Sequence, residues 1–272
     1  MLKLKENSGW VKVSNLGAEI ATGEFLIFAN CDDFCDPHQV TKLVKAINKN
    51  PTAGLVFSRS NIVDKDGVVL GNDYEGRGFR FKRKCASNTL ISGKLMTSFL
   101  FHSIVIPNLS AAIFRRSTFL EIGKFSEHVN IAADWEIYFR MAEKCDVAYL
   151  SEPLNFFRSH DDSIRSHTKV RAMQKDIAQL LLDQVKKSDR GLFQKLVYRH
   201  RLLYLLILVI RKPSKSDMSD FLYLIRFACT YDLFCLFVLP FATITRLSRI
   251  PVSLGLKLNR KLWKLAVPLL PR

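Results

Sequence analysis

The feature that most constrains the fold is a short apolar run that leads directly into two adjacent acidic residues. Residues 25–29, FLIFA, are aromatic or aliphatic, and Asn30, Cys31, Asp32 and Asp33 follow them. A continuous apolar run of this length is typical of a strand buried on both faces of a mainly parallel sheet. Ligands of open α/β sheets bind beyond the carboxyl ends of the strands, so Asp32 and Asp33 are predicted to face a ligand crevice.

Two interpretations of this acidic pair are open. Two carboxylates beside the neutral oxygen of Asn30 suit a divalent cation, magnesium or manganese, that bridges to phosphate oxygens. The alternative is a solvated turn before a helix that begins at Asp36 and Pro37, because Asp is common in turns and at helix N-termini. Residue types alone are compatible with both interpretations.

The pattern of the first 160 residues predicts an α/β domain. Apolar residues at helical spacing, bounded by Asp36-Pro37 and Asn50-Pro51, predict one helix. We expect further strands at 54–58, 108–114 and 147–150, short helices at 18–22 and 115–122, and a hairpin turn at 64–67. Alternating strands and helices indicate a mixed, mainly parallel sheet flanked by helices.

The segment 71–86 is polar, contains glycine and is predicted to be a mobile surface loop. It is also basic, so phosphate binding and plain solvation are both open for its charged residues, with solvation the more ordinary role of such a run. These residues are Arg77, Arg80, Lys82, Arg83 and Lys84.

A second acidic position opens a predicted amphipathic helix in the segment FSEHVNIAADWEIYFRMA. Its apolar face consists of Ile137, Tyr138, Met141 and Ala142, which places Asp134 in the first turn. The helix dipole and free amide groups favour an ionised carboxylate there, as a general base requires. A plain helix cap is the alternative role for Asp134.

Arg158 and His160 alternate along an expected extended segment, so their side chains point the same way. Two donor side chains on one face could hold a diphosphate group. A surface arginine and a structural histidine are the ordinary alternatives.

The positive charge is concentrated near the C-terminus. The formal net charge is +16, and residues 186–272 hold 17 Lys and Arg against 4 Asp, a net of +13. Apolar runs at 202–210 and 221–245 are too short or too interrupted for clean membrane spans. With the leucines and basic residues that follow, they predict a helical region, 167–272, on an anionic membrane surface.

A helical bundle packed on the preceding domain is the alternative for this region. Nucleic acid is not expected as a partner, because no recognition motif accompanies the charge. The six cysteines lack the paired spacing of a zinc site and are predicted to be free thiols in a reducing compartment.

Four segments together resemble the inverting glycosyltransferases of family 2. They are SNLGAEIATGEFLIFANCDDF, NPTAGLVFS with VDKDG, NLSAAIFRRSTFLEIGKFSEHVNIAADWEIYFRMA, and YLSEPLNFFRSHDDS, in the family's order across Ser14 to Ser166. The resemblance implies a GT-A fold over residues 1–166, a nucleotide-sugar donor, a divalent metal (Mn or Mg), and a glycan or lipid-linked acceptor. With the basic C-terminal region, we expect a cytoplasmic enzyme, peripheral on the inner face of the plasma membrane.

The resemblance also implies roles for single residues. The aspartate-x-aspartate element of the family aligns with residues 30–32, which makes Asp32 the metal ligand and places Asn30 and Asp33 at the donor. The acidic motif of the family aligns with Asp134 as the general base, and its Arg-x-His element aligns with Arg158 and His160 near the diphosphate.

Three departures from the family pattern stand out. Asn30 replaces the first aspartate of the metal motif, and Ala133 replaces the usual glutamate before the base. The N-terminal βαβ portion that holds the nucleotide base is also expected to be missing. We therefore expect a partial, N-terminally truncated domain, and a catalytically inactive fragment or scaffold is the alternative function.

Overall fold

A computed structural model describes residues 6–103, 105–129, 132–159, 176–177, 179–181 and 183–184. Its elements are, in chain order, α1 (Trp10–Ile20), β1 (Phe25–Ile27), β2 (Phe34–Cys35), α2 (Gln39–Lys49), β3 (Ala53–Val63), β4 (Val69–Asn72), η1 (Asp73–Gly76), α3 (Phe79–Lys84), β5 (Thr89–Ile91), α4 (Gly93–His102), η2 (Leu109–Ala111), β6 (Ala112–Arg115), α5 (Arg116–Glu121), α6 (Ala133–Lys144) and β7 (Asp146–Arg158).

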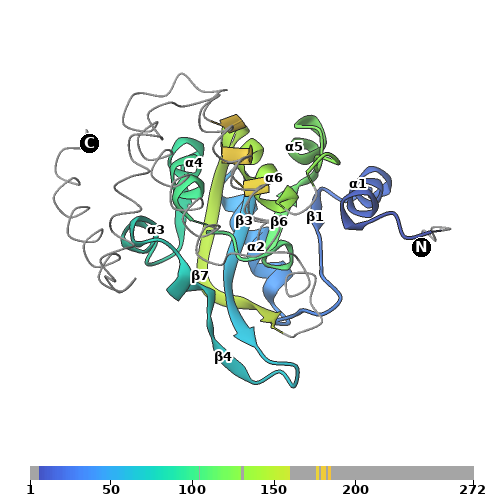
Figure 1. Cartoon of the computed structure of the whole chain (residues 1–272). Coiled ribbons are helices and arrows are strands. Elements are labelled where there is room, and N and C mark those ends of the chain that lie inside the picture. Colours follow the sequence, from blue (N-terminus) through green and yellow to red (C-terminus); the bar gives the residue numbers. More distant parts are fainter. Residues whose placement is uncertain are drawn as a thin grey trace, which may run out of the picture. The chain divides into compact units, whose positions relative to one another are not determined.

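The strands form one mixed sheet in the order β1-β6-β3-β7-β2, with β4 beside β3 and β5 beside β7. The long strands β3 and β7 run side by side, and the hairpin of β3 and β4 extends away from them (Figure 1). The mixed α/β fold is confirmed, but the expected parallel majority is wrong. Among the described strands only β3 and β7 pair in parallel; β3 and β4 form an antiparallel hairpin, and the other antiparallel pairs join strands that are distant in the sequence.

The apolar run at 25–29 does not form a strand buried on both faces. Strand β1 covers only Phe25–Ile27, lies at an end of the sheet order, and pairs antiparallel with β6. Within β1 only Leu26 is buried. Phe28, the first residue after this strand, packs into an aromatic cluster. An apolar run indicates that its residues are buried but not where their strand lies in the sheet. The sequence therefore could not show that β1 lies at an end of the sheet order.

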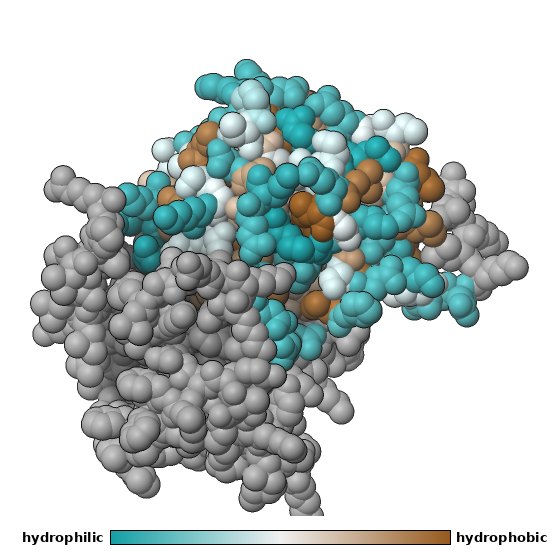
Figure 2. Space-filling model, turned by 90° about the horizontal axis from the view of Figure 1, so that it is seen from above, coloured by the Kyte–Doolittle hydropathy of each residue, from teal (hydrophilic) through white to brown (hydrophobic). Residues whose placement is uncertain are grey.

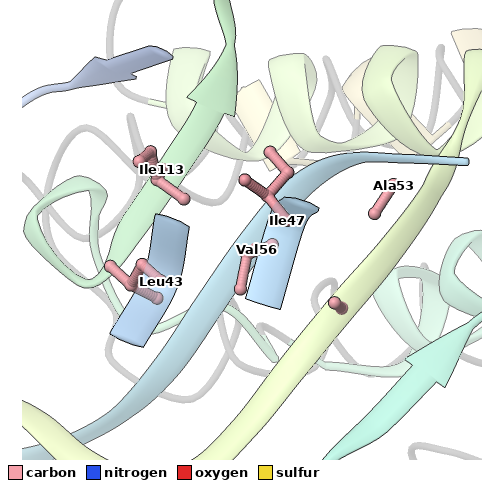
Figure 3. Packing of buried hydrophobic residues seen from close by; sticks show 6 residues of the cluster. Leu43, Ile47, Ala53, Val56 and Ile113 are labelled. Atoms are coloured by element: carbon pink, nitrogen blue, oxygen red, sulfur yellow. The ribbon is translucent and has the colours of Figure 1, made fainter. Parts of the chain in front are cut away.

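Helix α2 covers one face of the sheet. Leu43 and Ile47 of this helix pack against Val56 of β3 and Ile113 of β6, as Figure 3 shows. The helix begins after a turn in which the His38 amide donates to Asp36 Oδ1 at 2.8 Å. The predicted helix between Asp36-Pro37 and Asn50-Pro51 is therefore confirmed, with its apolar face toward the sheet.

The opposite face of the sheet carries an aromatic layer. Phe57 of β3 and Tyr149 of β7 have ring centroids 5.2 Å apart, and each ring also neighbours Phe81 of α3. The segment 71–86 is therefore not the predicted mobile loop, since it forms η1 and α3. Arg77 is not solvated either: it is 3% exposed, pairs with Asp73, and lies over these rings.

Two glycines allow the close packing that fixes α6 in place. A Cβ atom at Gly93, the first residue of α4, would lie 2.1 Å from the Ala142 carbonyl oxygen near the end of α6. A Cβ atom at Gly54 would lie 2.4 Å from Cys145 Sγ. Because neither position has room for a side chain, α6 lies directly against α4 and β3.

The first helix is longer than predicted, since α1 begins at Trp10 and not near residue 18. Tertiary contacts support its first half. Trp10 meets Phe125 edge to face at 5.3 Å, and Asn15 Nδ2 donates to the Phe125 carbonyl at 2.9 Å. The Phe125 amide donates back to Asn15 Oδ1 at 2.9 Å, so the helix depends on partners distant in sequence.

Most of the predicted C-terminal region, including the apolar runs at 202–210 and 221–245, lies outside the described residues. The described residues between 176 and 184 are helical, in agreement with the helical region predicted to begin at residue 167. No helix within the described part of the chain combines the length and hydropathy needed to cross a membrane. On the face seen in Figure 2 the described residues are mostly hydrophilic, with small, separate apolar patches.

Candidate functional site

The acidic turn, residues 30–33, lies between β1 and β2, the strands at the two opposite ends of the sheet order. The Asn30 amide donates to Ser110 Oγ at 2.9 Å, and the Asp33 amide donates to the Asn30 carbonyl at 3.4 Å. Asn30 and Cys31 are exposed, whereas Asp32 and Asp33 are half-buried. The turn is thus open to ligands on one side and bound to the domain on the other.

The carboxylate of Asp33 accepts three hydrogen bonds from the protein. Asn30 Nδ2 and Asn108 Nδ2 donate to Oδ2 at 3.1 and 2.5 Å, and the Arg158 amide donates to Oδ1 at 3.1 Å. Both oxygens therefore serve the turn itself. The predicted contact of Asp33 with a donor stays a prediction.

Arg158, the last residue of β7, connects the acidic turn to the β3–β4 hairpin. Its Nε donates to the Asp32 carbonyl at 2.9 Å, and its Nη1 donates to the carbonyls of Asp64, at 3.2 Å, and Lys65. The guanidinium also lies 5.5 Å from the ring centroid of Phe34. These contacts give Arg158 a structural role within the protein, and its predicted contact with a diphosphate is untested.

Asp32 is the residue of the turn best suited to a divalent cation. Magnesium is usually held by one or two carboxylates together with substrate phosphates. The side-chain nitrogen of Asn30 donates to Asp33 within the turn, so the side-chain oxygen of Asn30 is the atom suited to a cation. Across the described residues no group of three or more His, Cys, Asp or Glu could hold a metal alone.

Asp134 is the second residue of α6, as predicted, and it is half-buried. Its Oδ1 accepts the Trp135 amide at 2.7 Å, one of the amides that a helix leaves without partners at its N-terminus. One turn further on, Tyr138 is buried. Burial, and then the nearby Asp134 charge, raise the pKa of the Tyr138 hydroxyl well above its usual value, so this hydroxyl stays neutral.

An aromatic cluster connects the acidic turn with α6. Phe28, two residues before Asn30, lies 5.5, 5.2 and 5.0 Å from the ring centroids of Phe114, Phe119 and Phe125. Phe114 in turn stacks on Tyr138 of α6, at 6.3 Å and an interplanar angle of 10°. A continuous set of packed rings therefore joins the two regions that carry the predicted chemistry.

The structure brings Arg158 to the acidic turn that holds Asn30, Asp32 and Asp33, although more than 120 residues separate Arg158 from this turn. His160 lies outside the described residues, so its predicted role is untested.

Sequence reasoning missed the polar residues that support the turn, Asn108, Ser110 and Asn155. For Asn108 and Ser110 the signal was present, because both are polar residues inside the predicted buried strand NLSAAIF, whereas Asn155 lies beyond the strand predicted at 147–150.

The cysteines agree with the expectation of free thiols at the four positions described. Cys31 and Cys35 are exposed, and Cys85 and Cys145 lie in the interior or partly so. Burial raises the pKa of both the Cys85 and the Cys145 thiol to about 11, which makes them poor nucleophiles at neutral pH.

Comparison with known proteins identifies the family. The family described as Glycosyltransferase like family 2 matches residues 5–187, about two thirds of the chain. The chain belongs to this family. The resemblance found in the sequence, and the family-2-like glycosyltransferase that it implied, are confirmed at this level.

Two relatives match the chain over about half its length. An uncharacterized glycosyltransferase of Bacillus subtilis, YwdF, is 29% identical over 143 residues, which is 53% of this chain and 48% of that protein. A chondroitin synthase of Pasteurella multocida is 24% identical over 139 residues, which is 51% of this chain and 12% of that protein. The chain thus spans about half the length of the first relative and far less of the second.

A similar solved structure is a mannosyltransferase of Pyrobaculum calidifontis in complex with GDP-Man and Mn²⁺. It is 14% identical, with a TM-score of 0.47, and the match covers 90% of this chain and 68% of that chain.

Proposed function

We propose that this protein transfers a sugar from a nucleotide-diphosphate donor to a glycan or lipid-linked acceptor with inversion. Membership of the glycosyltransferase family supports the reaction class. The observation that carries the proposal is the acidic turn, where three hydrogen bonds to Asp33 hold the neighbouring Asp32 in a half-exposed position. A carboxylate presented in this way suits a cation that accompanies a diphosphate.

In this proposal Asp32 holds a divalent cation, Mn or Mg, with the Asn30 amide oxygen beside it. When bound, such a cation neutralises charge that develops on the leaving diphosphate. Arg158 holds the turn through backbone carbonyls. Direct contact of Arg158, Asp33 and His160 with the donor remains part of the proposal.

Asp134 is the proposed general base. Its position in the first turn of α6 favours the ionised carboxylate, which can take the proton from an acceptor hydroxyl. The acceptor oxygen then forms a bond to the anomeric carbon as the bond to the diphosphate oxygen breaks. A single displacement of this kind inverts the configuration at that carbon, and the nucleoside diphosphate leaves with the electron pair.

The test is a transfer and hydrolysis assay with Mn²⁺ and a panel of radiolabelled UDP- and GDP-sugars. We expect Asp134→Asn to lower turnover by about 10²- to 10⁴-fold, the usual contribution of a general base. Binding of the nucleoside diphosphate should persist. The matched control is Glu143→Gln, which removes the same charge from an exposed position on the same helix.

Activity that is indifferent to Asp134→Asn would overturn the assignment of the base. Binding of Mn²⁺ and nucleoside diphosphate without turnover on any donor would instead favour the alternative, a catalytically inactive scaffold. The assay measures turnover and calorimetry on the same wild-type sample measures binding, so the two outcomes are distinguished.

We also propose that the basic region 167–272 attaches the protein to the inner face of the plasma membrane. The support is its sequence, since 17 Lys and Arg oppose 4 Asp in residues 186–272. Each basic residue near an anionic surface contributes about 1 kcal/mol of binding free energy. Flotation with vesicles that contain anionic lipid tests this proposal, and a protein that stays unbound at low salt contradicts it.

A further inference from the structure

A chain of buried polar side chains runs beneath the acidic turn. Asn155 Nδ2 donates both to Ser60 Oγ, at 3.0 Å, and to Asn108 Oδ1, at 3.1 Å. Asn108 Nδ2 then donates to Asp33 Oδ2 at 2.5 Å. At the other end, the Ser60 amide donates to Asp73 Oδ1 at 2.7 Å. The chain crosses from β3 to β7 and reaches the turn through the residue before η2.

Burial makes this chain costly unless it is complete. Ser60 and Asn155 are 0% exposed, and Asn108 is 6% exposed. A buried donor or acceptor that loses its partner costs roughly 1–3 kcal/mol. The far end is also fixed, because Asp73 forms a buried ion pair with Arg77. The position of Ser60 is therefore set by the sheet and by a charged pair.

The chain also has a direction. Asn155 directs its amide hydrogens at two acceptors, so Asn108 must direct its oxygen at Asn155 and its own nitrogen at Asp33. Reversing either amide would place two oxygens against each other. The carboxylate of Asp33 thus receives a hydrogen bond from Asn108, whose orientation is set by Asn155.

We propose that Ser60 and Asn155 are positioning residues for the donor site, acting through Asn108 on Asp33 and so on the placement of Asp32. What the turn binds rests on the proposed function, but the positioning can be measured without any ligand. None of these side chains is assigned a contact with substrate.

The chain offers a matched pair of variants. Ser58 and Ser60 lie two residues apart on β3 and are both 0% exposed. Ser58 Oγ has no hydrogen-bond partner among the described residues, whereas Ser60 Oγ accepts from Asn155. Ser58→Ala and Ser60→Ala therefore remove the same atom at the same depth, and only the second interrupts the chain. Ser60→Thr keeps the hydroxyl and serves as the rescue variant.

The first measurement is hydrogen exchange of the Arg158 amide, which donates to Asp33, in the protein without ligand. We expect roughly fivefold faster exchange in Ser60→Ala, about the effect of one hydrogen bond, and no change in Ser58→Ala or Ser60→Thr. Equal exchange in Ser60→Ala and Ser58→Ala would overturn the proposal, whatever the ligand results.

The second measurement is calorimetric binding of Mn²⁺ with UDP or GDP to the same variants. Ser60→Ala should bind roughly fivefold more weakly than Ser58→Ala. If the wild type binds neither diphosphate while exchange at Arg158 responds to Ser60→Ala, the proposed function fails and the positioning of the turn stands. Equal binding by both alanine variants would overturn the link between the turn and the donor.

Discussion

The acidic turn and the first turn of α6 both carry carboxylates assigned to chemistry, yet the protein supports them in different ways. Polar side chains hold the acidic turn, with Asn108 on the Asp33 carboxylate, Ser110 on the Asn30 amide and Arg158 on the Asp32 carbonyl. Helix α6 is instead held by aromatic rings and by its close approach to α4 at Gly93, together with hydrogen bonds from Arg140 to the carbonyls of Ile122 and Lys124.

This difference fits the roles proposed for the two regions. Hydrogen bonds fix the orientation of individual atoms, as a site that binds a cation through oxygen atoms requires. Packing fixes the position of a whole element. A proposed base such as Asp134 needs mainly to be ionised and within reach of an acceptor hydroxyl.

The largest effect should come from breaking the packed side of this comparison. Phe114 is fully buried and contacts rings from both regions, so Phe114→Ala should lower the free energy of unfolding by about 3–5 kcal/mol. Urea denaturation measures the change. Phe34, which is 39% exposed, is the control, and an equal loss in Phe34→Ala would refute the importance of the cluster.

The hydrogen-bonded side should respond less in stability. Asp33→Ala removes the acceptor of three hydrogen bonds and leaves the side-chain amide of Asn108 without its acceptor. We expect the free energy of unfolding to fall by about 2 kcal/mol. The exposed Asp66, in the hairpin turn, is the control for removing a carboxylate. If thermal and urea unfolding of Asp33→Ala match those of Asp66→Ala, the acidic turn is not held as described.

The smallest change in stability is expected from a variant that removes one polar atom from the packed region. The hydroxyl of Tyr138 is buried and has no hydrogen-bond partner among the described residues, so Tyr138→Phe should be neutral or stabilise by up to about 1 kcal/mol. Tyr149→Phe should destabilise, because the Tyr149 hydroxyl accepts from Arg59 Nε at 3.3 Å. A clear loss of stability in Tyr138→Phe would show that the Tyr138 hydroxyl does more than pack.

Local pattern predicted the elements whose burial depends on their own sequence. Helix α2 and the β3–β4 hairpin were predicted because spacing and turn residues specify them directly. Helix α1 was predicted too short because its first turns rely on Phe125, more than 100 residues away. Segment 71–86 was misread because its charge suggested solvent, whereas the Asp73–Arg77 pair and the surrounding rings bury it.

The candidate site shows the same division. The positions of Asp32 and Asp134 followed from the strand and the helix beside them. The hydrogen-bond partners of Asp33 could not be predicted, because the strand order decides that Arg158 of β7 and Asn108, just before η2, reach the turn. An apolar run also cannot report that β1 pairs antiparallel at the end of the sheet.

Arg158 has a consequence beyond the geometry of the turn. Its guanidinium donates to the backbone carbonyls of Asp32, Asp64 and Lys65. Peptide carbonyls do not take up protons in the pH range that proteins tolerate, and arginine does not lose its proton there. The link between the hairpin and the acidic turn is therefore insensitive to acidification, so a protein in mild acid should keep these two loops together even where its carboxyl groups begin to change charge.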